Sequence, residues 1–299
     1  MEINLERSPD PLRAAATVVM VRDGINGLEV FLVKRHGLSE VLGGAYVFPG
    51  GKLDEADSHL DSRSLLDRTS EDLHSALNEP QLDAHEAAAL HFAALREAFE
   101  ETSVLFAHAA DAATQLQAWE LLREGRGFDE VIAMMGLRLQ ASALRAWSRW
   151  ITPAVGGVIR KRFDTRFFLA RMPAGQIARH DNHEAIDSVW LSPREALRQY
   201  WERTIELAPP QIMSLAHLAR HASAESALAE AAGRPPPLIH PEPLAGDGGP
   251  GELAPGERLI CYPGDCSHST RERALPGPTR LYYRGKRFEP ARGFEEFFS

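Results

Sequence analysis

Three glutamates, Glu97, Glu100 and Glu101, lie within five positions of the stretch LREAFEETSVLF. In a helix this i, i+3, i+4 spacing gathers their side chains on one face, where like charges repel by about 0.2–0.5 kcal/mol per pair. Such a face is either exposed to solvent or a binding site for a cation. Only Arg96 lies beside it, and no lysine at i+4 relieves the repulsion. Several converging carboxylates suit a hard divalent cation, Mg²⁺ or Mn²⁺.

A helix must position these glutamates, and the sequence predicts one over residues 86–102. Ala88, Phe92, Leu95 and Phe99 recur at helical spacing and form one apolar face. The glutamates occupy the arc opposite that face. The helix is therefore expected to pack its apolar side on a core and to present the carboxylates on the other side.

The upstream stretch FPGGK predicts a short strand over residues 45–48 that ends in a turn at Gly50 and Gly51. Two consecutive glycines allow positive φ and let another group approach the backbone closely. Exposed amides in such a turn also bind phosphate oxygens. Pro-Gly-Gly is common in ordinary turns, so its meaning depends on the glutamates downstream.

Together with the three glutamates, Gly51 and Arg96 resemble the Nudix box, a glycine followed downstream by Arg-Glu-aliphatic-x-Glu-Glu-x-Gly-aliphatic. The sequence departs from that pattern in three places. Gly51 precedes Arg96 by 45 positions, 31 more than in the family pattern. Ala88 stands where the family has an earlier glutamate, with Glu86 nearby, and Ser103 replaces the late glycine.

The resemblance implies hydrolysis of a nucleoside diphosphate derivative, with water attacking one phosphorus of its pyrophosphate. It implies that Glu97, Glu100 and Glu101 are ligands of Mg²⁺ or Mn²⁺ and that Glu100 or Glu101 also acts in catalysis. Arg96 would orient these carboxylates through an ion pair.

Many members of the family take a further carboxylate from a later strand or loop. Here Glu184 in DNHEAIDSVW is the first candidate, and Asp164 and Asp187 come next. The residues expected to contact the substrate are Arg35, Gly50 and Gly51.

Other segments narrow the resemblance to one branch of the superfamily. GGAYVFPGGKLDEAD, WITP, RFDTRFFLA and LAPPQ resemble the mammalian peroxisomal coenzyme A diphosphatases and their bacterial relatives, over about residues 12–220. This branch implies coenzyme A or acyl-CoA as substrate, with 3′,5′-ADP and (acyl-)phosphopantetheine as products. A coenzyme A signature of related enzymes is kept at Leu32, Arg35 and Gly44. Glu40 replaces one of its arginines, which reverses a charge near a polyanionic substrate.

Two alternatives are left open by the sequence. The nearer one is a hydrolase of ADP-ribose, NADH or dinucleoside polyphosphates. The other is a non-catalytic ligand sensor with the same fold, although a protein that only binds has no chemical need for three clustered carboxylates.

The pattern of elements predicts an α/β fold. β-rich runs flank a turn at residues 23–27, and RFFLA is the most strand-like later segment. Residues 111–149 are expected to be helical, and so are residues 209–233, which begin with two prolines. The resemblance implies the Nudix fold, a mixed β-sheet sandwiched between helices, with helical insertions. Three tryptophans are expected in the core rather than over a pocket: Trp119, Trp147 and Trp150.

The domain division places a Nudix hydrolase domain at residues 1–233. Within it, residues 54–85 are interpreted as an insertion outside the core, hereafter the insertion. Residues 234–299, hereafter the extension, begin with a Pro/Gly-rich linker and contain strand candidates, and they leave a role in binding a partner open.

Composition limits the classes of partner. A net charge of −9 over 299 residues argues against nucleic acid and anionic membranes, whereas a metal would supply positive charge for an anionic substrate. A small nucleotide-derived molecule is the expected partner, and a homodimer is kept open as the assembly state. Two cysteines, no apolar run of membrane-spanning length and no signal peptide indicate a cytoplasmic protein. Cys261, Cys266 and His268 are interpreted as ordinary side chains rather than zinc ligands, because a fourth ligand is not evident.

Overall fold

The computed structural model describes residues 10–37, 42–59, 62–154, 161–181, 185–246, 253–254 and 256–299. Two residues singled out from the sequence, Glu40 and Glu184, lie outside these ranges. Among the helices within them, none combines the length and the apolar composition needed to cross a membrane.

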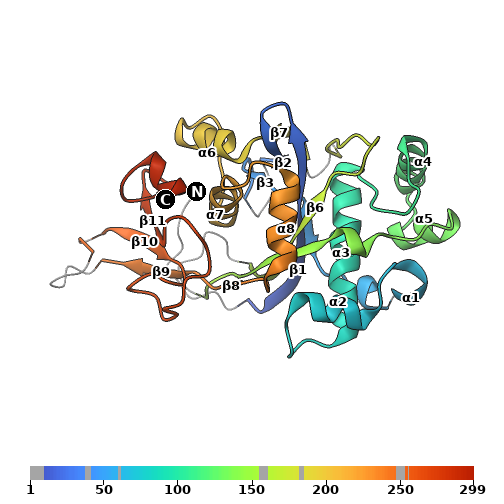
Figure 1. Cartoon of the computed structure of the whole chain (residues 1–299), viewed down its shortest axis with the longest axis horizontal. Coiled ribbons are helices and arrows are strands. Elements are labelled where there is room, and N and C mark those ends of the chain that lie inside the picture. The colour runs from blue at the N-terminus through green and yellow to red at the C-terminus, as the bar shows by residue number, and fades with distance from the viewer. Residues whose placement is uncertain are drawn as a thin grey trace.

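A mixed sheet of eight strands forms the centre of the molecule (Figure 1). Its two longest strands, β1 (Leu12–Gly24) and β6 (Arg162–Arg171), run parallel and side by side. Strand β2 (Gly27–Arg35) forms the predicted hairpin with β1. The path of the sheet is β3-β2-β1-β6-β5-β8, with β4 paired to β1 and β7 paired to β2. The remaining strands are β3 (Tyr46–Val47), β4 (Gly50–Lys52), β5 (Arg145–Ile151), β7 (Ala185–Leu191) and β8 (Leu238–Ile239).

Helices cover both faces of this sheet. Side chains alternate between the faces along β1, so the apolar residues of this strand need to be covered on each face. Val18 and Met20 belong to one core, and Val19 and Val21 belong to the other. The first core is covered by α1 (Ser62–Leu65), α2 (Ser70–Leu77), α3 (Ala84–Thr102), α4 (Ala112–Arg123) and α5 (Phe128–Met134). The second is covered by α6 (Pro193–Trp201), α7 (Pro209–Leu218) and α8 (Ala224–Gly233). Short 3-10 turns occur at Ala56–His59, Ala141–Ala143 and Phe294–Phe298. The predicted α/β layering is confirmed.

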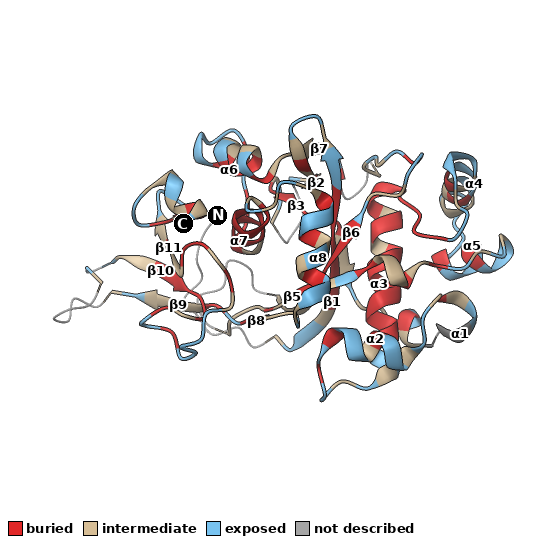
Figure 2. Cartoon of the chain, in the orientation of Figure 1, coloured by how far each residue is buried: buried red, intermediate tan, exposed pale blue. Residues whose placement is uncertain are grey.

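Helix α3 confirms the helix predicted over residues 86–102, and most of its length is buried (Figure 2). Asp83 caps its start by accepting a hydrogen bond from the amide of Glu86. Ser103 caps its end with a φ of 58°, a left-handed conformation that glycine adopts most easily. The family pattern has its late glycine at this C-cap. The left-handed backbone conformation explains why the family pattern has glycine there.

The insertion contributes to the core, contrary to its interpretation from sequence. Leu66 and Leu73 are buried in the core beneath α3. Glu79 is also buried, and its Oε2 lies 2.6 Å from Nη2 of Arg166 on the sheet. The apolar positions of the insertion are dispersed among acidic ones, so its composition gave no sign of burial.

The prediction of helix as far as residue 149 is wrong at its end. Helices α4 and α5 account for the first part, but Arg145–Ile151 forms strand β5, which pairs antiparallel with β6. Trp147 and Trp150 are buried in the core from this strand, as expected of them. Pairing with a distant strand decides the conformation here, and local propensity does not contain that information.

The prediction of one continuous helix over residues 209–233 is also wrong. Helix α7 ends at Leu218, and α8 begins after Ser223, whose hydroxyl accepts a hydrogen bond from the amide of Ser226. A serine in this position starts a new helix by satisfying one of its free amides. The chain therefore turns between two shorter helices.

The extension contains the strands expected there. Strand β8 joins the main sheet beside β5, and a small antiparallel sheet follows. Ile260, Tyr262 and Phe297 are buried in the core that α6, α7 and α8 cover. Cys261 and Cys266 are both free thiols. The strands of the small sheet are β9 (Glu242–Ala245), β10 (Arg258–Cys261), β11 (Arg280–Arg284) and β12 (Arg287–Glu289).

Candidate active site

The glutamate cluster, Glu97, Glu100 and Glu101, lies where strand β4 passes the C-terminal half of α3. Glu101 Oε2 accepts a hydrogen bond of 3.0 Å from the amide of Gly50. A Cβ on Gly51 would lie 2.4 Å from Glu97 Oε1, so any larger residue would displace that carboxylate. The two glycines predicted to contact substrate therefore also position two of the glutamates.

Arg96 connects the cluster to the insertion. Its Nε and Nη2 donate hydrogen bonds of 2.9 and 2.8 Å to the two oxygens of Asp57, whose side chain is 2% exposed. Its Nη1 donates to Glu97 Oε1 at 2.8 Å and to Glu100 Oε2 at 2.9 Å. This geometry agrees with the orienting role that the resemblance implies for Arg96. Asp57 is a site residue that the sequence did not reveal, because it lies 39 positions before its partner.

Burial and crowding shape the electrostatics of the cluster. Burial raises the pKa of Glu100, against the lowering effect of the Arg96 charge. Burial also acts against the charged form of Arg96, but the hydrogen bond to Asp57 and the charges of Glu97 and Glu100 outweigh it and raise the pKa of Arg96. Glu101 is 6% exposed, and its Oε1 lies 3.9 Å from Nη1 of Arg35.

The side chains of this cluster are of the chemical type that Mg²⁺ and Mn²⁺ take as ligands. These hard cations prefer carboxylate oxygens, and α3 carries three carboxylates within five positions. Glu97 and Glu100 share the Arg96 guanidinium, and Glu101 accepts from the Gly50 amide. A divalent cation would offset the raised pKa of Glu100 by favouring its charged form. The residues that would hold the ion are Glu97, Glu100 and Glu101.

A cavity of about 530 Å³ opens beside the cluster. Gly50, Gly51 and Glu97 form part of its wall. Four cationic side chains also line it: Arg13, Arg35, Lys52 and Lys161. Apolar residues that complete the wall include Trp150, Ile151, Phe163, Pro210, Pro241 and Ile260, the last two from the extension. The cavity is therefore suited to a ligand with both anionic and apolar parts.

The candidates for an additional carboxylate differ in their surroundings. Glu184 lies outside the described residues and stays a prediction. Asp164 Oδ2 lies 2.7 Å from Arg149 Nη2 and 3.1 Å from Arg166 Nη1. Asp187 accepts a hydrogen bond of 2.6 Å from the hydroxyl of Tyr46, which lowers the pKa of that aspartate. In this structure, both aspartates are engaged with groups other than the cluster.

Glu86 does not join the cluster either. It is exposed at the start of α3, and the 11 positions to Glu97 correspond to about 16 Å along a helix. Glu86 therefore does not take the place of the earlier glutamate of the family pattern.

Comparison with known proteins shows which protein family the chain belongs to. A NUDIX hydrolase from Alicyclobacillus acidocaldarius has a similar structure, with a TM-score of 0.58 and 27% identity over 74% of this chain and 97% of that one. The acyl-coenzyme A diphosphatase NUDT19 of Xenopus laevis is 29% identical over 229 residues, which are 65% of this chain and 60% of the frog protein. The human protein of the same name is 28% identical over 275 residues, 75% of this chain and 72% of its own length.

The fold is therefore the Nudix fold, as the resemblance implied. Residues 12–218 match the family described as the NUDT19 Nudix domain, and the chain belongs to that family. The aligned region spans less than two thirds of the frog relative.

Proposed function

We propose that this chain is a metal-dependent diphosphatase that hydrolyses the pyrophosphate of coenzyme A or acyl-CoA to 3′,5′-ADP and (acyl-)phosphopantetheine. The observation that carries this proposal is the glutamate cluster at the wall of a cavity with both cationic and apolar sides. An acyl-CoA combines a polyanionic nucleotide with a long, largely uncharged arm. The names of the frog and human relatives, acyl-coenzyme A diphosphatases, support the same substrate class.

The reaction adds water to one phosphorus and breaks its bond to the bridging oxygen, which leaves with the other phosphate. A bound Mg²⁺ or Mn²⁺ would neutralise phosphoryl oxygens and lower the pKa of water. Glu97, Glu100 and Glu101 are proposed to hold the ion, with Glu100 or Glu101 accepting the proton of the attacking water. Arg96 keeps two of these carboxylates in position, and it is itself fixed by Asp57.

The substrate is proposed to bind along the cationic side of the cavity. Arg35 reaches from β2 toward Glu101 and would contact the pyrophosphate. Arg13 and Lys161 line the cavity at the adjoining starts of β1 and β6, where a further phosphate would find positive charge. The Gly50 amide donates to Glu101 here, which leaves Gly51 as the residue of the turn proposed to approach the substrate directly.

A substrate panel tests this proposal. The protein is incubated with Mg²⁺ or Mn²⁺ and with CoA, dephospho-CoA, acyl-CoA, ADP-ribose, NADH or a diadenosine polyphosphate, and products are identified by mass spectrometry. CoA and acyl-CoA should be cleaved fastest, and dephospho-CoA more slowly because it lacks one phosphate. Faster cleavage of ADP-ribose would contradict the substrate class alone. Binding of these ligands without turnover of any of them would contradict the enzymatic function and favour a sensor.

A further inference from the structure

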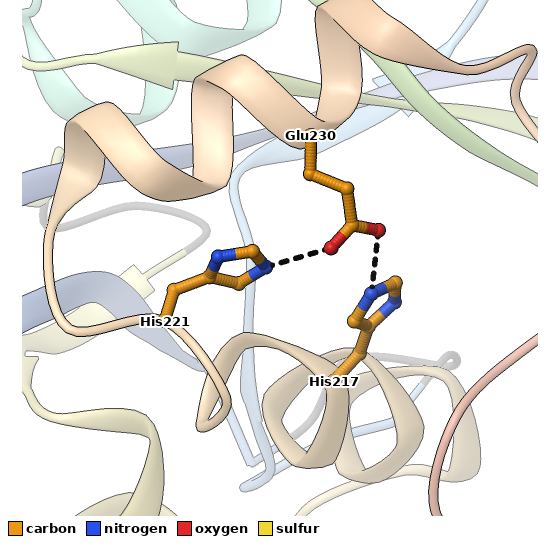
Figure 3. Close-up of side chains that lie close together, drawn as sticks. All are labelled: His217, His221 and Glu230. Atoms are coloured by element: carbon orange, nitrogen blue, oxygen red, sulfur yellow. Dashed lines mark hydrogen bonds and ion pairs between the residues drawn. The ribbon is translucent and has the colours of Figure 1, made fainter.

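A second group of ligand-type side chains lies in the layer of α7 and α8, on the opposite face of the sheet from α3. His217 in α7, His221 in the link after it and Glu230 on α8 point toward one another (Figure 3). Their ligand atoms all lie within 4.8 Å of one another. This group shares no residue with the glutamate cluster, and the hydrolysis proposed above does not use it.

The geometry brings two imidazoles to one carboxylate. His217 Nε2 lies 2.8 Å from Glu230 Oε1, and His221 Nε2 lies 3.0 Å from Oε2. The histidine side chains are only 5% and 8% exposed. Figure 3 shows both imidazoles directed at the two oxygens of this carboxylate, and His221 Nε2 is itself buried.

A tautomer available to His221 suits a metal. His221 Nδ1 lies 2.9 Å from the hydroxyl of Ser226, and donation to this oxygen leaves a lone pair on Nε2 that faces Glu230. His217 Nε2 faces Oε1 of the same carboxylate, so an ion between α7 and α8 would meet a ring nitrogen from each histidine. Two neutral imidazoles and a carboxylate are a known ligand set for Zn²⁺, with the fourth position left to water.

Arg234 is the competing cation at this place. Its Nε lies 2.8 Å from Glu230 Oε1 and neutralises that carboxylate when no metal is bound. The guanidinium also donates to the carbonyl of Trp147 and lies 4.6 Å from the centre of its ring. These contacts with Trp147 do not involve Glu230, so Arg234 keeps partners when it releases the carboxylate to an ion.

We propose that His217, His221 and Glu230 bind one Zn²⁺ ion, which joins α7 to α8 across residues 219–223. Because the fold brings together ligands from both sides of this link, the ion binds the folded chain more tightly than the unfolded one. Bound Zn²⁺ therefore stabilises the folded chain. The readouts below are binding and stability, so they are independent of any hydrolase activity.

Metal titration of the full-length chain tests the site. After treatment with EDTA and desalting, the protein is titrated with Co²⁺ alone by visible absorption and with Zn²⁺ alone by calorimetry and thermal unfolding. One equivalent of Co²⁺ should give the absorption bands of tetrahedral coordination, and Zn²⁺ should displace it and raise the melting temperature. His221→Ala and Glu230→Gln should each weaken Zn²⁺ binding by at least about tenfold.

Two further variants separate a metal site from a hydrogen-bonded cluster. Arg234→Gln removes the competitor for Oε1 and should strengthen Zn²⁺ binding, whereas a cluster without metal would only lose stability. Glu225→Gln on the exposed side of α8 (88% exposed) and Glu100→Gln on α3 should leave the Co²⁺ bands unchanged. The proposal is overturned if the wild type gives no tetrahedral Co²⁺ bands, or if these bands persist in both His221→Ala and Glu230→Gln.

Discussion

Arg96 is the residue on which the arrangement of the glutamate cluster depends most. It links Glu97 and Glu100 to Asp57, a buried carboxylate outside the helix. The spacing of residues on α3 was enough to single out Arg96 and the glutamates. Asp57 could not be found in this way, because its pairing is created by the fold and not by any local pattern.

The change Asp57→Asn tests this dependence. The buried guanidinium would lose its charged bidentate partner, so the free energy of unfolding should fall by about 3 kcal/mol. The kcat of the proposed hydrolysis should fall by roughly tenfold or more, because two carboxylates lose their orientation. Urea unfolding and steady-state kinetics on the same preparation measure both effects.

Asp54→Asn is the matched control. Asp54 Oδ2 lies 3.6 Å from Arg96 Nη2, and its side chain is 40% exposed. Loss of this exposed ion pair should cost less than about 1 kcal/mol. If Asp57→Asn has no larger effect than Asp54→Asn on stability and kcat, Arg96 does not depend on Asp57.

Among the elements, α3 could be predicted from the sequence and β5 could not, because the two depend on different kinds of contact. Helix α3 carries its information locally, in apolar residues at helical spacing between an aspartate cap and a left-handed C-cap. Strand β5 exists because Arg145–Ile151 pairs with β6, which lies later in the chain. The link between α7 and α8 was missed because no proline or glycine interrupts residues 211–232, and Ser223 is the cap that marks the boundary.

Helix α3 also contains a buried titratable residue, His91. Its Nδ1 donates a hydrogen bond of 2.7 Å to the carbonyl of Ala87, and its ring lies 4.6 Å from that of Phe168. Burial lowers the pKa of His91 to about 4, from an ordinary value of 6.5. The fold therefore holds this imidazole in its neutral form.

Stability should depend on pH through this residue. Between pH 6.5 and 4 the unfolded chain binds a proton at His91 that the folded chain does not bind. The contribution is present above pH 6.5 and is lost as the pH falls to 4, amounting to about 3 kcal/mol. Chemical denaturation across this window should give a shallower slope for His91→Gln than for the wild type. Equal slopes in the wild type and His91→Gln would contradict the lowered pKa of His91. Part of the slope that remains in His91→Gln comes from His217, whose pKa is also lowered by burial.

At the scale of the whole molecule, the extension forms part of the cavity wall. The family match ends at residue 218, yet Pro241 and Ile260 line the same space as Gly51 and Glu97. The sequence left the role of residues 234–299 open, because nothing local indicated that they return to the sheet. We infer that the extension helps to bind the uncharged arm of the proposed substrate.

Two alanine substitutions separate this role from simple packing. Ile260 and Leu281 face each other in neighbouring strands of the extension and are both buried, but only Ile260 lines the cavity. Ile260→Ala and Leu281→Ala should each lower the free energy of unfolding by about 2–4 kcal/mol. Only Ile260→Ala should raise the KM for acyl-CoA, by roughly threefold to tenfold, through lost apolar contact. Equal KM values in the two variants would contradict the inference.

The most direct test of the central proposal is hydrolysis of acyl-CoA in H₂¹⁸O, followed by mass spectrometry. With Mg²⁺ or Mn²⁺ the wild type should yield 3′,5′-ADP and acyl-phosphopantetheine, with one heavy oxygen in only one of the two products. EDTA should stop the reaction, and Glu101→Gln should slow it at least about a hundredfold. Glu86→Gln on the exposed start of the same helix should not slow it. Undiminished hydrolysis by folded Glu101→Gln, or intact acyl-CoA after incubation of the wild type with either metal, would contradict the account.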